Sequence, residues 1–235
     1  MQTLRTVNLP RVLAILATVL FLKVTLSVIW GYRDYLPPNF RSDFLLGRES
    51  YFFGVYQWAF YTHIAAGPLT LIFGLILISD RFRMRFPKWH RSLGKIQVAM
   101  VLLLLLPSGL WMARYAATGA VAGIGLSVLA ILTGLSIFMG WRSAVRRQFV
   151  AHRLWMWRCF LLLSSAVVLR LIGGFVTGTN IGDAWAYPVA TWVSWMLPLA
   201  VFELALTIKQ ETRPSASVSD KSRSTALSLR AIEKC

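Results

Sequence analysis

Six long apolar segments dominate the sequence and limit what the chain can fold into. Their approximate bounds are Val12–Trp30, Tyr51–Ser79, His90–Trp111, Val121–Trp141, Leu154–Phe175 and Trp185–Ile208. A bilayer core of about 30 Å requires roughly 20 helical residues to cross it. Each segment is predicted to be a helix, because lipid offers the backbone no hydrogen-bond partner and the short alternating strands of a barrel are not seen. The sequence therefore predicts an all-α polytopic membrane bundle of about six transmembrane helices over residues 1–210.

The composition agrees with a membrane protein. Only 14% of the 235 residues are charged, whereas 57% are hydrophobic. A soluble domain carries about a quarter charged residues, so this shortfall argues against a water-soluble enzyme. The second apolar segment, Tyr51–Ser79, is long enough to tilt or to begin as an interfacial helix.

Lysine and arginine are distributed unevenly between the two sides of the predicted bundle. The N-terminus, the loops after the second and fourth spans and the tail carry 19 of them, whereas the opposite side carries 4. The positive-inside rule then predicts that both termini are cytoplasmic. We expect anionic lipid head groups to be the partners of these loops, and the net charge of +16 needs no nucleic acid to explain it. The predicted membrane-surface residues are Arg81, Arg83, Arg85, Arg91, Arg146, Arg147, Arg153 and Arg158.

The chain changes character after the sixth span. Residues 211–235 are rich in serine, threonine and charge. Such a segment buries too little apolar surface to fold alone, so we predict a mostly disordered cytoplasmic tail.

Three histidines are candidate cofactor ligands, and their depth separates them. His63 lies 12 residues after Tyr51, about 18 Å along a helix, which places it near mid-membrane. It is either a helix–helix hydrogen-bond donor or a ligand. His90 and His152 both lie at the cytoplasmic borders of their spans. Matching depth is what a bis-histidine haem b requires, and contact with lipid phosphate is the structural alternative.

Arg170 is the most conspicuous charge inside a span. It lies about five residues from the outer end of the fifth segment, where an unpaired charge costs a few kcal/mol. It either reaches outer head groups or binds an anionic ligand, a haem propionate or a quinone oxygen. Asp183 and Glu49 are the carboxylates within its reach.

Glu203 is the one carboxylate inside a predicted span, near the cytoplasmic face. It either forms a salt bridge with Arg153 or Arg158, or acts as a proton carrier or metal ligand. Two imidazoles and a carboxylate suit iron or zinc, so His90, His152 and Glu203 form a candidate metal trio.

Several short motifs point to a known family. They are FYTHIAAGP at residues 60–68, HRSLGK at 90–95, PSGLW at 107–111, HRLWMWR at 152–158 and VVLRL at 167–171. Together they resemble the bacterial predicted membrane proteins grouped as domain of unknown function 2306, over roughly residues 47 to 174. The resemblance implies a multi-pass protein of a bacterial inner membrane, and it implies no particular reaction.

Three function classes remain open from the sequence. The first is a haem-binding redox protein that exchanges electrons with a quinone. The second is a transporter in which Glu203, His63 and Arg170 line a polar path, although no pair of broken helices occupies corresponding halves. The third is a non-catalytic scaffold or assembly factor that docks protein partners through its basic loops and tail. A Gly-rich phosphate loop, HExxH, CxxC and GxSxG are all absent from the sequence, so enzymatic activity is left open.

Overall fold

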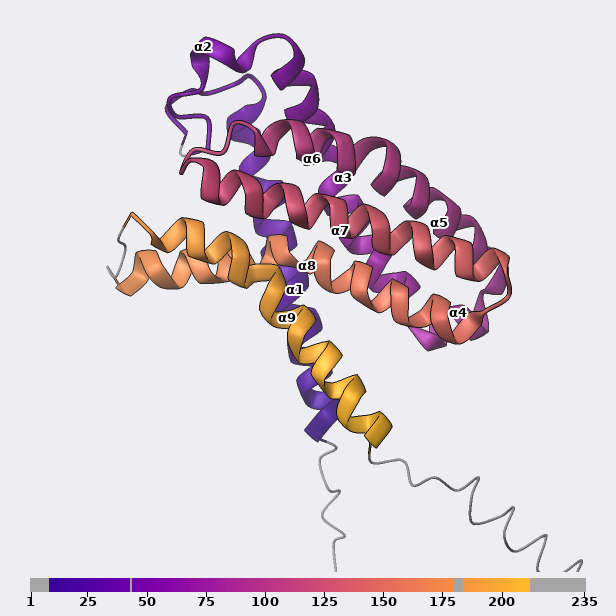
Figure 1. The fold of residues 1–235 in the computed structure, drawn as a ribbon. Helices are drawn as coiled ribbons and strands as arrows, with labels where there is room; N and C mark the ends of the chain where they lie inside the picture. The colour runs from indigo at the N-terminus through magenta and orange to yellow at the C-terminus, as the bar shows by residue number, and fades with distance from the viewer. Residues whose placement is uncertain (1–8, 43, 180–183, 212–235) are drawn as a thin grey trace, which may run out of the picture. The chain divides into compact units, whose positions relative to one another are not determined.

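The computed structural model describes residues 9–42, 44–179 and 184–211, and these residues form helices and turns without strands (Figure 1). The long helices are α1 (Leu9–Gly31), α3 (Val55–Leu77), α5 (Pro87–Ala99), α7 (Ala120–Val145), α8 (Phe149–Thr179) and α9 (Ala186–Glu211). The short ones are η1 (Tyr32–Tyr35), α2 (Glu49–Phe52), α4 (Asp80–Arg85), the π-helix η2 (Met100–Leu105) and α6 (Leu106–Ala113). Within the described ranges six helical spans are long and apolar enough to cross a bilayer, which confirms the predicted all-α architecture.

The chain divides into two compact units, Met1–Met196 and Leu197–Cys235. The first unit contains five of the six spans and the first part of α9. The second contains the rest of α9, including Glu203. The predicted tail falls almost entirely outside the described residues, which end at Glu211.

Two spans differ in detail from the sequence prediction. The second apolar segment is interrupted at Gly54, whose φ of 98° is a left-handed value that favours glycine. Its start is therefore a separate short helix, α2, and the spanning helix begins at Val55. The third span runs from Pro87 to Ala113 as α5, η2 and α6. The π-helix ends just before Pro107, which has no backbone N–H to donate.

The first unit packs tightly along α6, α7 and α8. Small residues at Gly123 and Gly134 let α6 approach α7, since a Cβ atom there would lie 2.7 Å from the Ala113 carbonyl oxygen and 2.9 Å from a Leu106 methyl group. A three-residue turn joins α7 to α8, and these helices lie side by side with α3 and α6 (Figure 1). The buried core between them includes Ile137.

The two ends of the first unit differ in character. The basic end, as we call it, comprises α4, the start of α5, the end of α7 and the start of α8, where most of the predicted surface arginines lie. The other end, here the aromatic end, comprises residues 32–56 and the loop between α6 and α7. Leu45, Phe52, Tyr56 and Phe60 are buried there, and Tyr51 stacks on Tyr115 with ring centroids 4.8 Å apart.

Candidate functional site: an amphipathic pocket inside the bundle

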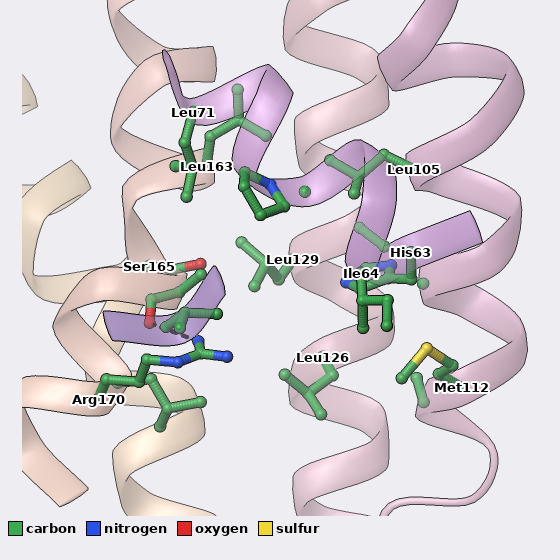
Figure 2. Close-up of a pocket in the computed structure, with 18 of the residues that line it drawn as sticks. His63, Ile64, Leu71, Leu105, Met112, Leu126, Leu129, Leu163, Ser165 and Arg170 are labelled. Carbon is green, nitrogen blue, oxygen red and sulfur yellow. Dashed lines mark hydrogen bonds between the residues drawn. The ribbon is translucent and has the colours of Figure 1, made fainter. Parts of the chain in front are cut away.

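A cavity of about 610 Å³, here the central pocket, lies inside the first unit (Figure 2). Side chains from α1, α3, α6, α7, α8 and the start of α9 all contribute to its wall, together with η1 and the loop before α2. The volume is within the range of about 300–1,000 Å³ that is typical of small-molecule sites. The pocket is therefore large enough for a ligand rather than for one or two waters.

The arginines and most of the tyrosines that line the central pocket lie near its aromatic end, and leucines and valines predominate further in. Near the aromatic end the lining is formed by Tyr32, Tyr35, Arg48, Tyr56, Arg170 and Tyr187. Towards the middle of the bundle aliphatic residues predominate, beside the hydroxyls of Thr70, Thr133 and Ser165. The aliphatic residues are Leu71, Val101, Leu105, Leu162, Leu163 and Val167. On α3 the 15 residues from Tyr56 to Leu71 span about 22 Å. This gradient matches an amphiphile whose head lies at the aromatic end.

His63 lies between the two regions, on α3, seven residues after Tyr56. Its Nδ1 is 3.2 Å from the Ser108 hydroxyl oxygen on α6. The Ser108 hydroxyl has one proton, which it donates to the Leu104 carbonyl at 2.5 Å. This arrangement places the imidazole proton on Nδ1, which donates to Ser108, and the ring also has the Leu105 backbone as a hydrogen-bond partner. Nε2 is then the acceptor nitrogen of the ring.

The absence of a side chain at Gly109 leaves space for the His63 ring. A Cβ atom at Gly109 would lie 3.3 Å from the ring carbon Cε1, which is tighter than most real contacts. The helix–helix hydrogen bond predicted for His63 is thus present, and the ring also lines the pocket.

Arg170 projects from α8 into the central pocket, across from His63 (Figure 2). It lies nine residues before the end of α8 at Thr179, deeper than the sequence suggested, because the helix extends beyond the predicted segment. One guanidinium nitrogen donates to the Ala166 carbonyl at 3.0 Å, which leaves further donors available. Its charge interacts electrostatically with His63.

Arg48 is a second cation in the pocket wall, and it is buried, with only 7% of its surface exposed. Its guanidinium carbon lies 4.4 Å from the centre of the Phe44 ring, and one terminal nitrogen donates to the Phe44 carbonyl. Its Nε has no hydrogen-bond partner within the described chain. A buried donor without a partner costs roughly 1–3 kcal/mol, more for a charged group.

The described lining of the pocket is cationic. Arg48 and Arg170 belong to it, and among the residues that the structure describes it contains neither Asp nor Glu. Among the described residues no ion pair involves either arginine, and Glu49, which the sequence suggested as a partner of Arg170, is exposed. Asp183, the other suggested partner, lies outside the described residues. An anion that enters the pocket would meet two guanidinium groups.

His90 and His152 lie at the basic end and do not line the central pocket. They are close enough to interact electrostatically. His152 places Nδ1 2.9 Å from the Gly140 carbonyl, so Nδ1 donates and Nε2 is an acceptor. His90 Nδ1 is buried without a hydrogen-bond partner among the described residues.

The predicted metal trio is only partly located. Glu203 belongs to the second unit, which is described by itself. Among the described residues there is no group of three His, Cys, Asp or Glu side chains that could hold a metal ion. The trio of His90, His152 and Glu203 therefore stays a prediction.

The predicted membrane-surface arginines lie mostly on the exposed face of the basic end. Arg81, Arg83, Arg85, Arg91, Arg146, Arg147 and Arg153 are exposed, whereas Arg158 is half-buried over the Trp155 ring. Arg83 and Arg153 also share Asp80, at 3.0 and 2.6 Å. Asp80 therefore joins the start of α4 to α8.

Comparison with known proteins identifies the family. The family model described as "Predicted membrane protein (DUF2306)" matches residues 60–206, which is more than half of the chain. The chain belongs to the DUF2306 family. The match confirms the resemblance seen in the sequence motifs and the multi-pass membrane class. Neither a curated protein nor a solved structure matches the chain. Most of the pocket wall, including His63 and Arg170, lies within the DUF2306 match, whereas Arg48 precedes it.

Sequence reasoning missed three functional candidates in this DUF2306 chain. Arg48 was counted as a loop charge, although its position within a run of aromatic residues was a signal of burial. Ser108 and Asp80 were not singled out from the sequence. The latter two depend on contacts between helices that the sequence does not display.

Proposed function

We propose that this DUF2306 protein binds, within the bilayer, an amphiphilic ligand with an acidic head group. The observation that carries the proposal is the pair of arginines, Arg48 and Arg170, in a pocket whose described lining residues include no carboxylate. Charges at membrane depth are expensive unless they are paired or hydrated. Guanidinium groups bind carboxylates and phosphates through charge-assisted hydrogen bonds. An acidic head group would therefore neutralise the pocket, and the apolar residues beyond His63 would hold the body of the ligand.

An acidic lipid is the ligand class that the lining favours most. The gradient from tyrosines and arginines to leucines and valines follows the head-to-tail order of such a lipid. A neutral quinone, which the sequence left open, fits the aromatic end but leaves both guanidinium groups without an anion. A transporter or carrier of such a lipid and a lipid-modifying enzyme both use a site of this kind.

Haem b is the second candidate ligand, and like an acidic lipid it combines an apolar body with acidic groups. It is an apolar body with two acidic propionates, and the acceptor nitrogen Nε2 of His63, whose ring lines the pocket, favours it specifically. His63 would be its ligand and Arg48 and Arg170 would pair with the propionates. The bis-histidine alternative at His90 and His152 is supported by their electrostatic contact, but neither residue lines the central pocket.

Native mass spectrometry of the purified protein tests the proposal. Wild-type protein extracted from its membrane is expected to carry an adduct that fragments as an acid. The double variant Arg48→Gln, Arg170→Gln should lose that adduct. Arg114→Gln is the matched control, because Arg114 is an exposed arginine near the aromatic end that does not line the pocket. A neutral adduct such as a quinone, or an adduct that survives the double substitution, would contradict the proposal.

Visible absorption spectra of the same samples distinguish haem b from an acidic lipid. Haem b gives a Soret band and, after dithionite, α bands that His63→Ala should abolish. If the bands are instead lost in His90→Ala or His152→Ala, the bis-histidine site holds the haem. A colourless protein that carries an acidic adduct would support the acidic lipid over haem b.

We further propose that the basic end faces the cytoplasm of a bacterial inner membrane. The excess of Lys and Arg in the loops at this end supports that orientation. The exposed arginines there would contact anionic lipid head groups.

A further inference from the structure

The polar end of the central pocket brings two arginines towards one set of hydroxyl groups. Arg48 comes from the loop before α2 and Arg170 from α8, yet the Tyr187 hydroxyl interacts electrostatically with both. Tyr56 likewise interacts electrostatically with Arg48, and Tyr32 with Arg170. These tyrosines line the same part of the pocket. Two cations and several tyrosine hydroxyls thus line one part of the pocket.

Both guanidinium groups keep donors that have no partner among the described residues. Arg48 is buried, with 7% of its surface exposed, and its Nε is one such donor. Arg170 donates from one nitrogen to the Ala166 carbonyl, and no other hydrogen bond of its five N–H donors is found within the described part of the chain. A carboxylate has two oxygens and one negative charge, whereas a phosphate monoester has three acceptor oxygens and a charge of about −1.5 to −2 at pH 7.

We propose that the head group held by Arg48 and Arg170 is the phosphate monoester of a lipid. The inference rests on the proposed binding of an acidic amphiphile and specifies its head group. The phosphate lies between the two guanidinium groups at the aromatic end, with the tyrosine hydroxyls as further donors. The alkyl or prenyl chain runs past His63 towards Leu71 and Val101. The arginine pair therefore acts as the specificity element that selects a doubly charged head over a singly charged one.

A series of ligands with one shared C12 chain tests the head group directly. The probes are dodecyl phosphate, its methyl diester, laurate and dodecanol, measured by equilibrium binding to the full chain in a non-ionic detergent at pH 8. We expect dodecyl phosphate to bind about tenfold or more tightly than laurate or the diester, since a further charge-assisted hydrogen bond contributes roughly 1.5–3 kcal/mol. Dodecanol should bind most weakly.

Substitutions then test whether the two arginines cause the preference for dodecyl phosphate. Arg48→Gln and Arg170→Gln should each remove the preference for dodecyl phosphate over laurate, whereas Arg114→Gln should keep it. Arg170→Lys keeps the charge but not the planar fork, so it should restore only part of the preference. An equal loss in Arg114→Gln would overturn the assignment. The comparison of ligands on the wild-type protein needs no variant, so a poorly folding variant does not remove the test.

The outcomes separate this inference from the broader proposal. If laurate binds as tightly as dodecyl phosphate and both arginine variants weaken its binding, the phosphate assignment is wrong, whereas the proposed binding of an acidic amphiphile is supported. If dodecanol binds as tightly as the acids, both proposals are wrong.

Discussion

Replacing Gly123 with alanine tests the packing that forms one wall of the pocket. The new Cβ atom would lie 2.7 Å from the carbonyl oxygen of Ala113, a residue of α6 that itself lines the pocket. Ordinary contacts between carbon and carbonyl oxygen begin at about 3.3 Å, so the two helices must separate by about 0.6 Å. The oxygen cannot turn away, because it belongs to the backbone. Such overpacking costs typically about 1–3 kcal/mol.

Gly173→Ala is the matched control for this prediction. Gly173 also lies within a long helix, but a Cβ atom there meets nothing within 4 Å. Both substitutions gain up to about 1 kcal/mol of helix propensity, so the difference between them isolates the clash. For a domain of this size 1 kcal/mol shifts the midpoint of thermal unfolding by about 2–4 °C. Thermal unfolding in detergent should therefore place Gly123→Ala about 2–12 °C below Gly173→Ala. Equal midpoints would refute the close approach of α6 and α7.

Three further outcomes are expected. The double-mutant cycle of Asp80→Asn and Arg153→Gln should give a coupling of about 1 kcal/mol or less, because both side chains are exposed; a coupling well above that would mean that the pair is buried in the membrane-bound protein. Ser108→Ala removes the acceptor of the imidazole proton, so it should destabilise the protein by about 1–3 kcal/mol, and thermal unfolding at wild-type temperature would contradict the hydrogen bond. Reporter fusions after Lys209 should be cytoplasmic and fusions after Thr118 external, and the reverse pattern would exclude the predicted orientation.

The spans were predictable because length and hydropathy alone decide whether a helix crosses a bilayer. The sequence therefore located all six within the described residues. It also singled out Arg170, because a charge inside a span is unusual whatever the fold. Helix ends were less accurate: α8 continues to Thr179 because apolar and small residues give no stop before the loop.

The pocket itself was not predictable from hydropathy. Arg48 is buried against the Phe44 ring, and Leu45 and Phe52 are buried in the neighbouring aromatic cluster. A loop-by-loop charge count instead treats this segment as solvent-exposed chain. The tautomer of His63 depends on the register of α3 against α6, and the ion pair of Asp80 joins residues 73 positions apart. Such contacts are long-range, so a local pattern does not encode them.

Photo-crosslinking with an acidic amphiphile tests the central claim most directly. A dodecyl phosphate that carries a diazirine in mid-chain is added to the purified protein, irradiated, and its attachment sites are mapped by peptide mass spectrometry. Labelling should fall on the walls of the central pocket, at residues such as Leu105, Leu129 and Leu163, and excess unlabelled dodecyl phosphate should suppress it. Arg170→Gln should reduce it as well. Labelling confined to outward-facing residues such as Leu103, insensitive to competition and to Arg170, would contradict an acidic ligand inside the bundle.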